Sequence, residues 1–114
     1  MKNKNMINLQ QLQKDVYQNK IDKGFNTTDI AQEFCRAHEE LSEAFKKYNQ
    51  DESGVGEELA DVAIFLLGIS EIMGFDLQEE ILKKIEKNKK RKYKTHINKE
   101  GKEVFIRVPT DDDK

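Results

Sequence analysis

Between residues 30 and 48 the apolar side chains return at steps of three and four, the spacing of one face of an α-helix. An earlier stripe of the same period predicts a helix over residues 8–22. Helices with one apolar face bury that face against one another, so the two stripes favour a helical bundle. The longer stripe consists of Ile30, Phe34, Ala37, Leu41, Ala44, Phe45 and Tyr48, and the shorter one of Leu9, Leu12 and Val16.

Glycines and acidic residues mark where these helices begin and end. Gly24 is the expected C-terminal stop of the first helix, and residues 27–29 (Thr-Thr-Asp) offer N-caps for the second. A third helix is expected from about Val55 to Gly74. Its segment 59–69 is apolar nearly all round, which is typical of a central, buried helix.

The last quarter of the chain changes in character. Asp76 and Glu79 have the form of a capping box at the start of a fourth helix, which ends in the basic run 87–94. Residues 95–108 predict a β-hairpin that turns near Asn98–Gly101. We expect an all-α fold, a four- to five-helix bundle, with a small C-terminal β-hairpin. The expected division is a helical domain at 1–93, the hairpin at 94–109 and a disordered tail at 110–114.

Composition limits the classes of protein that remain. A chain of 114 residues forms one modest core, so we expect help from self-association. The single cysteine excludes an internal disulfide and a multi-thiolate zinc site. The longest apolar run, 62–67, is far too short to span a membrane, and we expect a cytoplasmic protein without a membrane partner. The near-equal charges (20 Lys and Arg, 22 Asp and Glu) create no global field that attracts nucleic acid.

Two pairs of carboxylates stand out on the second and third helices. Glu40 and Glu43 are three residues apart, and so are Glu58 and Asp61, so each pair lies on one helix face. The connection over residues 49–56 is short, so antiparallel packing brings the two pairs to similar heights. Asp61 is the one charged residue within 59–69, and a buried carboxylate requires a cation or a metal ion. Converging carboxylates repel one another, and Mg²⁺, which prefers oxygen ligands, relieves that repulsion.

These acids also carry a family resemblance. The string Glu39-Glu40-Leu-Ser-Glu43, followed after fourteen residues by Glu58-Leu-Ala-Asp61, resembles the EExxE and ExxD signature of the MazG-type all-α nucleoside triphosphate pyrophosphohydrolases. Farther along, Gly74-Phe-Asp-Leu, then Lys84, Asn88 and Arg91, are similar to the family's fourth-helix pattern. The resemblance covers roughly residues 9–93 and leaves out the hairpin and the tail.

The resemblance implies an enzyme that hydrolyses ribo- or deoxynucleoside triphosphates to the monophosphate and pyrophosphate. It assigns the metal ion, Mg²⁺ or alternatively Mn²⁺, to Glu40, Glu43, Glu58 and Asp61, and Glu39 to orienting the attacking water. It also implies a homodimer or homotetramer. Lys84, Asn88 and Arg91 are the expected contacts to the phosphates, and Tyr17 and Phe25 are candidates to stack on the base.

Other functions remain open from the sequence alone. Related phosphoribosyl-ATP and dUTP pyrophosphatases use similar acidic helices. The segment 83–94 holds eight basic residues among twelve, with Tyr93 among them, as a non-enzymatic nucleic-acid-binding module would. The acidic pairs argue against nucleic acid as the partner, because they repel its backbone. A helical interaction module without activity is the third alternative.

Overall fold

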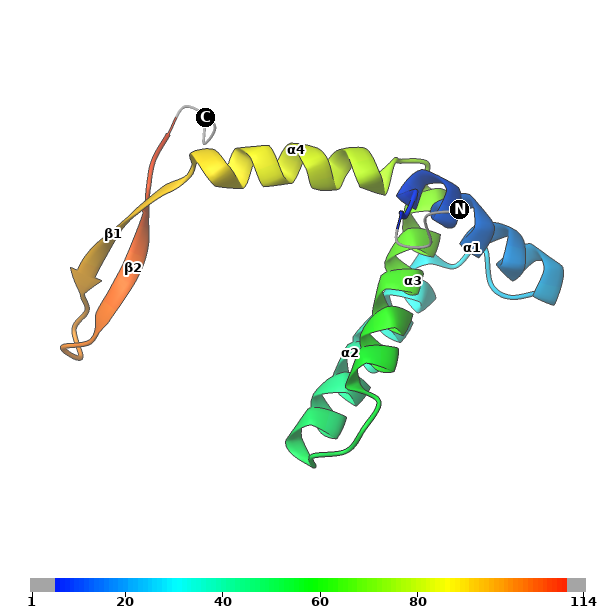
Figure 1. The fold of residues 1–114 in the computed structure, drawn as a ribbon, viewed down its shortest axis with the longest axis horizontal. Coiled ribbons are helices and arrows are strands. Elements are labelled where there is room, and N and C mark those ends of the chain that lie inside the picture. The colour runs from blue at the N-terminus through cyan, green and yellow to red at the C-terminus, as the bar shows by residue number, and fades with distance from the viewer. Residues whose placement is uncertain (1–5, 111–114) are drawn as a thin grey trace. The chain divides into compact units, whose positions relative to one another are not determined.

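The computed structural model describes residues 6–110, which form four helices followed by one antiparallel hairpin (Figure 1). This confirms the predicted all-α fold with a small C-terminal hairpin. The chain divides into two compact units, residues 1–78 and 79–114, which are described separately below. Apart from Thr110, the predicted disordered tail lies outside the described residues. The elements are α1 (Leu9–Lys23), α2 (Ile30–Asn49), α3 (Val55–Met73), α4 (Leu77–Lys90), β1 (Lys92–Ile97) and β2 (Glu103–Val108).

Capping residues and glycines that can be recognised in the sequence determine where the helices begin and end. Gly24 and Gly74 stop α1 and α3 in the left-handed conformation, at φ 71° and 82°. The side chain of Asp29 accepts a hydrogen bond from the backbone N–H of Gln32, 3.1 Å away, and caps α2. Asn8 caps α1 in the same way by accepting from the backbone N–H of Gln11. The predicted stops at both glycines and the Asp29 cap are therefore confirmed.

The core of the first unit forms where α3 packs against α2 and against α1. Figure 1 shows α2 and α3 running side by side, joined at one end by a short loop. Gly68 of α3 faces α1, and a Cβ there would lie in ordinary van der Waals contact with Val16 Cγ1 at 3.6 Å and Lys20 Cδ at 3.7 Å. The buried apolar residues are Ala37, Ala44, Leu67 and Ile69.

A polar side chain of α1 fixes the turn between α3 and α4. Gln13 is buried and donates from Nε2 to the carbonyl oxygen of Phe75 at 2.8 Å and to Glu71 Oε1 at 3.0 Å. Its Oε1 accepts from the backbone N–H of Leu77 at 3.1 Å. One amide thus satisfies backbone groups that the helix ends leave without partners.

The expected burial of α3 is only partly found. Its C-terminal half is buried at residues 67–70, whereas Leu59, Ile64 and Leu66 keep nearly half of their surface exposed, at 48%, 46% and 44%. On α2, Leu41 and Phe45 are also exposed. Within one chain α3 has neighbours on two sides, α1 and α2, which do not cover its whole apolar surface.

The second unit contains most of α4 and the hairpin. β1 pairs with β2 from Lys92 opposite Val108 to Ile97 opposite Glu103, so the first strand begins three residues before the predicted Thr95. In the turn, Asn98 Oδ1 accepts from the backbone N–H groups of Glu100 and Lys102, at 2.9 and 3.0 Å. Gly101 supplies the positive φ of 79° that closes the turn.

Within residues 6–110 no helix combines the length and apolar character needed to cross a membrane.

Candidate functional site

Three of the predicted acids meet where α2 and α3 lie against each other. Glu40 comes from α2, and Glu58 and Asp61 come from the first two turns of α3. Each offers one carboxylate oxygen, and these oxygens lie within 4.8 Å of one another. All three side chains are half-buried. The convergence follows from the antiparallel packing of two helices joined by a short loop, as the spacing of the pairs implied.

The electrostatics of the acidic triad (Glu40, Glu58 and Asp61) are those of carboxylates held too close together. The pKa of Glu40 is raised above 4.5, first by a hydrogen bond to Glu58, then by partial burial and by the charges of Glu58, Asp61 and Glu43. The pKa of Glu58 is lowered, first by a hydrogen bond from Lys47 and then by the one from Glu40. Without a cation, Glu40 is therefore the member of the triad that takes up a proton more readily than a free carboxyl group, and its protonated form donates to the Glu58 carboxylate.

Lys47 is a site residue that the sequence reasoning missed. Its Nζ lies 2.9 Å from Glu58 Oε1, and the pKa of Lys47 is raised mainly by this hydrogen bond. Gly54, at φ 98°, makes room for it, because a Cβ at that position would lie 3.0 Å from Lys47 Nζ. Lys47 follows Glu40 by seven residues, which places both on the same face of α2. This spacing is the feature of the sequence from which Lys47 could have been predicted as a site residue.

The other two predicted acids lie at the edge of the triad. Glu43 is exposed, and it reaches the triad through its charge, which contributes to the raised pKa of Glu40. Glu39 is exposed as well. The structure thus brings Glu40, Glu58 and Asp61 together as a possible set of metal ligands, while Glu43 and Glu39 are not part of that set.

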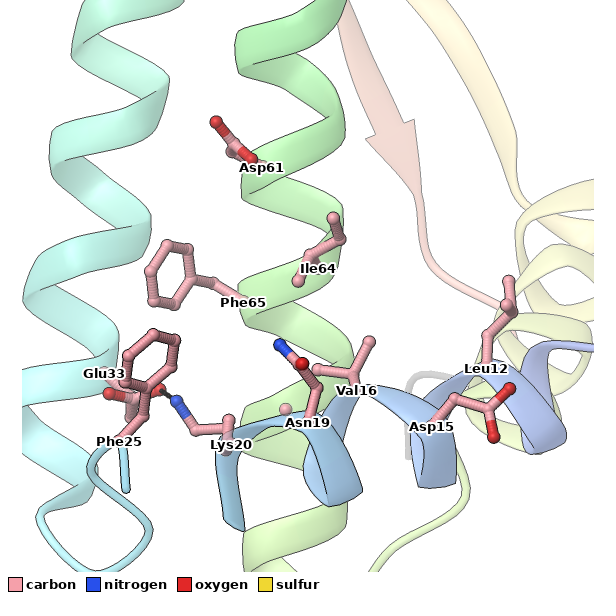
Figure 2. Close-up of a pocket in the computed structure, with 11 residues that line it drawn as sticks. Leu12, Asp15, Val16, Asn19, Lys20, Phe25, Glu33, Asp61, Ile64 and Phe65 are labelled. Carbon is pink, nitrogen blue, oxygen red and sulfur yellow. Dashed lines mark hydrogen bonds and ion pairs between the residues drawn. The ribbon is translucent and has the colours of Figure 1, made fainter. Parts of the chain in front are cut away.

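A pocket of about 400 Å³ opens between α1 and α3, with Asp61 at one end (Figure 2). At the other end Lys20 donates to the buried Glu33 carboxylate. Phe25, the predicted base-stacking residue, lines the pocket together with Phe65. The remaining lining residues are Leu12, Asp15, Val16, Asn19, Ile64 and Gly68.

Tyr17, the other predicted base-stacking residue, is half-buried and does not line this pocket. Asn19, which the sequence analysis did not select, does line it. In Figure 2 the Asn19 amide points towards Phe65 and Ile64. Within the described part of the chain the Asn19 side chain makes no hydrogen bond. An amide in a pocket with a mostly apolar lining can both donate to and accept from a ligand.

The predicted phosphate contacts Lys84 and Asn88 belong to α4, and Arg91 directly follows its last residue, Lys90, in the second unit. Their spacing of four and three residues places them along one face of the helix and of its C-terminal end. The pKa of Lys84 is lowered, chiefly by the positive charge of Arg91, then by partial burial and by Lys87 and Arg107. Lys84 therefore lies in a cluster of positively charged side chains.

Comparison with known proteins agrees with the acidic signature. Neither the curated proteins nor the solved structures contain a match to this chain. The family model described as the MazG-like family matches residues 30–104, which include all of α2, α3 and α4. The match covers well over half of the 114 residues and contains every predicted metal ligand. The chain therefore belongs to the MazG-like family.

Proposed function

We propose that the protein is a Mg²⁺-dependent nucleoside triphosphate pyrophosphohydrolase that converts ribo- or deoxynucleoside triphosphates to the monophosphate and pyrophosphate. The observation that carries this proposal is the meeting of three carboxylate oxygens, from Glu40, Glu58 and Asp61, within 4.8 Å. Membership of the MazG-like family supports a pyrophosphatase-type activity for these acids. The reaction adds water across the anhydride that joins the α- and β-phosphates, and this anhydride is broken.

The triad suits a small divalent cation. Its donors are all carboxylate oxygens, which Mg²⁺ and Mn²⁺ prefer. The pKa of Glu40 is raised first by its hydrogen bond to Glu58, then by burial and by the charges of the neighbouring acids, and a cation would remove that last contribution. We assign the metal ion to Glu40, Glu58 and Asp61, with Glu43 as an additional ligand. Such an ion supplies charge neutralisation at the phosphates and lowers the pKa of an attacking water.

The surrounding residues have roles that follow from where they lie. Lys47 holds Glu58 Oε1 at 2.9 Å, so it fixes the direction in which the carboxylate of Glu58 points. A deprotonated carboxylate of the triad can accept the proton that the attacking water gives up. We keep Glu39, exposed one position before Glu40, as the residue that orients this water.

We assign the nucleobase to the pocket between α1 and α3. Phe25 and Phe65 present aromatic faces on which a planar base can stack, and the Asn19 amide can read the edge of the base. Asp61 lies at one end of the same pocket, so a base bound there leaves its phosphates next to the triad. We keep Tyr17, near the middle of α1, as a further candidate contact to the base.

Lys84, Asn88 and Arg91 are the proposed contacts to the phosphate oxygens that the metal ion leaves uncovered. Two cations and an amide on one helix face can each donate to such oxygens. This assignment uses the family pattern together with the shared face of α4.

We also propose that the protein is a homodimer or homotetramer. Leu41, Phe45 and Leu59 of α2 and α3 are 50%, 63% and 48% exposed, and apolar surface of this extent favours association. A second copy that covers these residues would complete the burial that the sequence of α3 predicts.

The decisive experiment is a panel of ribo- and deoxynucleoside triphosphates incubated with Mg²⁺ or with chelator, with pyrophosphate and monophosphate detected directly. We expect Mg²⁺-dependent release of both products by the wild type and loss of this release in Glu58→Gln. Glu57→Gln is the matched control, since Glu57 is the exposed neighbouring acid on α3. Orthophosphate with a diphosphate product would contradict the proposed bond cleavage. Activity only with dUTP or phosphoribosyl-ATP would select the corresponding related enzyme.

A further inference from the structure

The positive charges of α4 fall into two sets. Two lysines are compensated within the helix, because Lys83 Nζ lies 4.0 Å from Glu80 Oε2 and Lys89 Nζ lies 3.1 Å from Glu86 Oε1. Three other lysines of α4, Lys84, Lys87 and Lys90, and Arg91, which directly follows the helix, form no ion pair with any residue in the described range 6–110. The charge of this second set is therefore left for something outside the helix to balance.

Three of the unpaired cations are aligned, and two of these three are half-buried. Lys84, Lys87 and Arg91 follow one another at steps of three and four, so they lie along one face of α4 and of its C-terminal end. Lys87 and Arg91 are half-buried, whereas Lys83 and Lys89 are exposed. The Nε of Arg91 is buried and has no hydrogen-bond partner among the described residues. A buried N–H without an acceptor is costly, and an anionic ligand on this face would supply acceptors nearby.

The hairpin brings a fourth cation to the same place. β1 begins at Lys92, directly after Arg91, and the register pairs Tyr93 with Arg107 of β2. Arg107 therefore lies at the end of the hairpin that joins α4, not at its turn. Its charge reaches α4, since Arg107 is one of the cations that lower the pKa of Lys84, after Arg91 and Lys87. Four like charges thus gather within the second unit.

We propose that Arg107 completes a phosphate-binding site with Lys84, Lys87 and Arg91, and that the hairpin serves to deliver Arg107 to this face of α4. The ligand class is a polyphosphate, whose oxygens accept hydrogen bonds from guanidinium and ammonium groups. Arg107 lies beyond residues 30–104, so it is an addition to the part of the chain that the family model describes. That the polyphosphate is a nucleoside triphosphate rests on the proposed function, but the site itself does not.

The test measures binding of inorganic tripolyphosphate to the full chain by calorimetry, without Mg²⁺. We expect Arg107→Gln to weaken binding about tenfold, the effect of losing one charge-assisted hydrogen bond, and Arg107→Lys to recover part of the loss. Lys102→Gln is the matched control, because it removes the same charge at the far end of the hairpin; we expect a change below about twofold. Equal losses in the two Gln variants, or no loss in Arg107→Gln, would overturn the inference.

Lys87→Gln provides an independent test that leaves the hairpin untouched. If Lys87 and Arg107 contact the same ligand, each variant weakens tripolyphosphate binding, and the double variant loses less than the sum of the two. Full additivity would place the two residues in separate sites and contradict the proposal. Far-ultraviolet circular dichroism of each variant identifies any loss that comes from unfolding.

Two further measurements separate this inference from the proposed function. If Arg107→Gln weakens tripolyphosphate binding but the wild type hydrolyses no nucleotide, the phosphate site stands and the proposed activity fails. If the wild type hydrolyses nucleotides and Arg107→Gln changes neither KM nor tripolyphosphate binding, the activity stands and the phosphate site fails. If Arg107→Gln weakens binding of a single-stranded oligonucleotide and leaves tripolyphosphate unaffected, the cations serve a nucleic-acid backbone and the inference is wrong.

Discussion

The ammonium group of Lys20 in α1 donates a hydrogen bond to the carboxylate of Glu33 in α2, and both residues are more than nine-tenths buried. Asn26 completes the arrangement by donating to the second Glu33 oxygen at 3.1 Å. The Lys20 ammonium also lies 5.9 Å from the centre of the Phe65 ring, so the pair connects all three helices of the first unit. Removing one member of a buried, hydrogen-bonded ion pair strongly destabilises the fold, because the other charge stays buried without its partner.

We therefore expect Glu33→Gln to lower the free energy of unfolding by about 3 kcal/mol, because it leaves the Lys20 ammonium buried without its counter-charge. Urea denaturation followed by circular dichroism measures this value. The double variant Lys20→Met with Glu33→Leu should regain much of the loss, since it removes both charges. A loss below about 1 kcal/mol in Glu33→Gln would show that water reaches the pair.

Lys47 gives a prediction about metal binding. We expect Lys47→Met to lower the affinity for Mg²⁺ about tenfold, because Glu58 loses the partner that fixes its orientation. Isothermal titration with Mg²⁺ measures the change, and Lys47→Arg should retain more affinity than Lys47→Met. Lys46→Met is the control, since Lys46 is the exposed neighbour on α2. Tighter binding in Lys47→Met would show that Lys47 competes with the cation.

Gly54 and Gly56 form a matched pair for testing how Lys47 is accommodated. We expect Gly54→Ala to destabilise the protein by about 1 kcal/mol or more, since φ is 98° and the new Cβ would lie 3.0 Å from Lys47 Nζ. Gly56→Ala meets no atom within 4 Å and lies inside α3, so it should stabilise by about 0.5–1 kcal/mol. Thermal unfolding of both variants checks the difference in sign. The same sign in both would contradict this interpretation.

The pH dependence follows from Glu40. Its pKa is raised above 4.5, so between 4.5 and the raised value the native state holds a proton that the unfolded chain has released. The metal-free protein therefore loses stability as pH rises through the raised pKa, and a bound cation removes that cost. Glu58 has a lowered pKa, so its contribution is present above 4.5 and is lost only as pH falls through the lowered value.

We accordingly expect Mg²⁺ to raise the Tm by several degrees at about pH 7.5 and by much less at about pH 5, where protons compete for Glu40. Differential scanning fluorimetry with and without Mg²⁺ measures both shifts. In Glu40→Gln the shift should be small at both values. Equal shifts at the two values in the wild type would place the cation away from Glu40.

The exposed apolar residues of α2 give a prediction about assembly. Phe45 is 63% exposed, and in the proposed homo-oligomer we expect a second copy to cover it. Phe45→Glu should then shift the protein towards monomer in sedimentation-velocity experiments, since a carboxylate would be buried in the interface. Lys46→Glu, next along α2 but charged and exposed in the wild type, is the control. A wild-type monomer at micromolar concentration would refute the proposal.

The sequence predicted those features that depend on neighbours along the chain. The stop at Gly24, the cap at Asp29 and the alignment of Glu58 with Asp61 all follow from spacing within one helix. Antiparallel packing then brought Glu40 to these two acids because the connecting loop is short.

Features that depend on contacts between distant segments were not predicted. Lys47 meets Glu58 only because Gly54 leaves space across the loop, and Asn19 lines the same pocket as Phe65 only because α1 packs against α3. The exposure of Leu59 was missed because an apolar helix surface does not specify whether its cover comes from the same chain.

The hydrogen bond between Glu40 and Glu58 raises the pKa of Glu40, so the metal-free triad holds a proton up to a higher pH than a free carboxyl group does. Over that range of pH a cation that takes both carboxylates must expel this proton, so uptake of the ion acidifies the medium. The heat measured on binding then includes the ionisation of the buffer and differs between phosphate and Tris. Binding of Mg²⁺ and binding of a proton therefore oppose each other at this one pair of side chains.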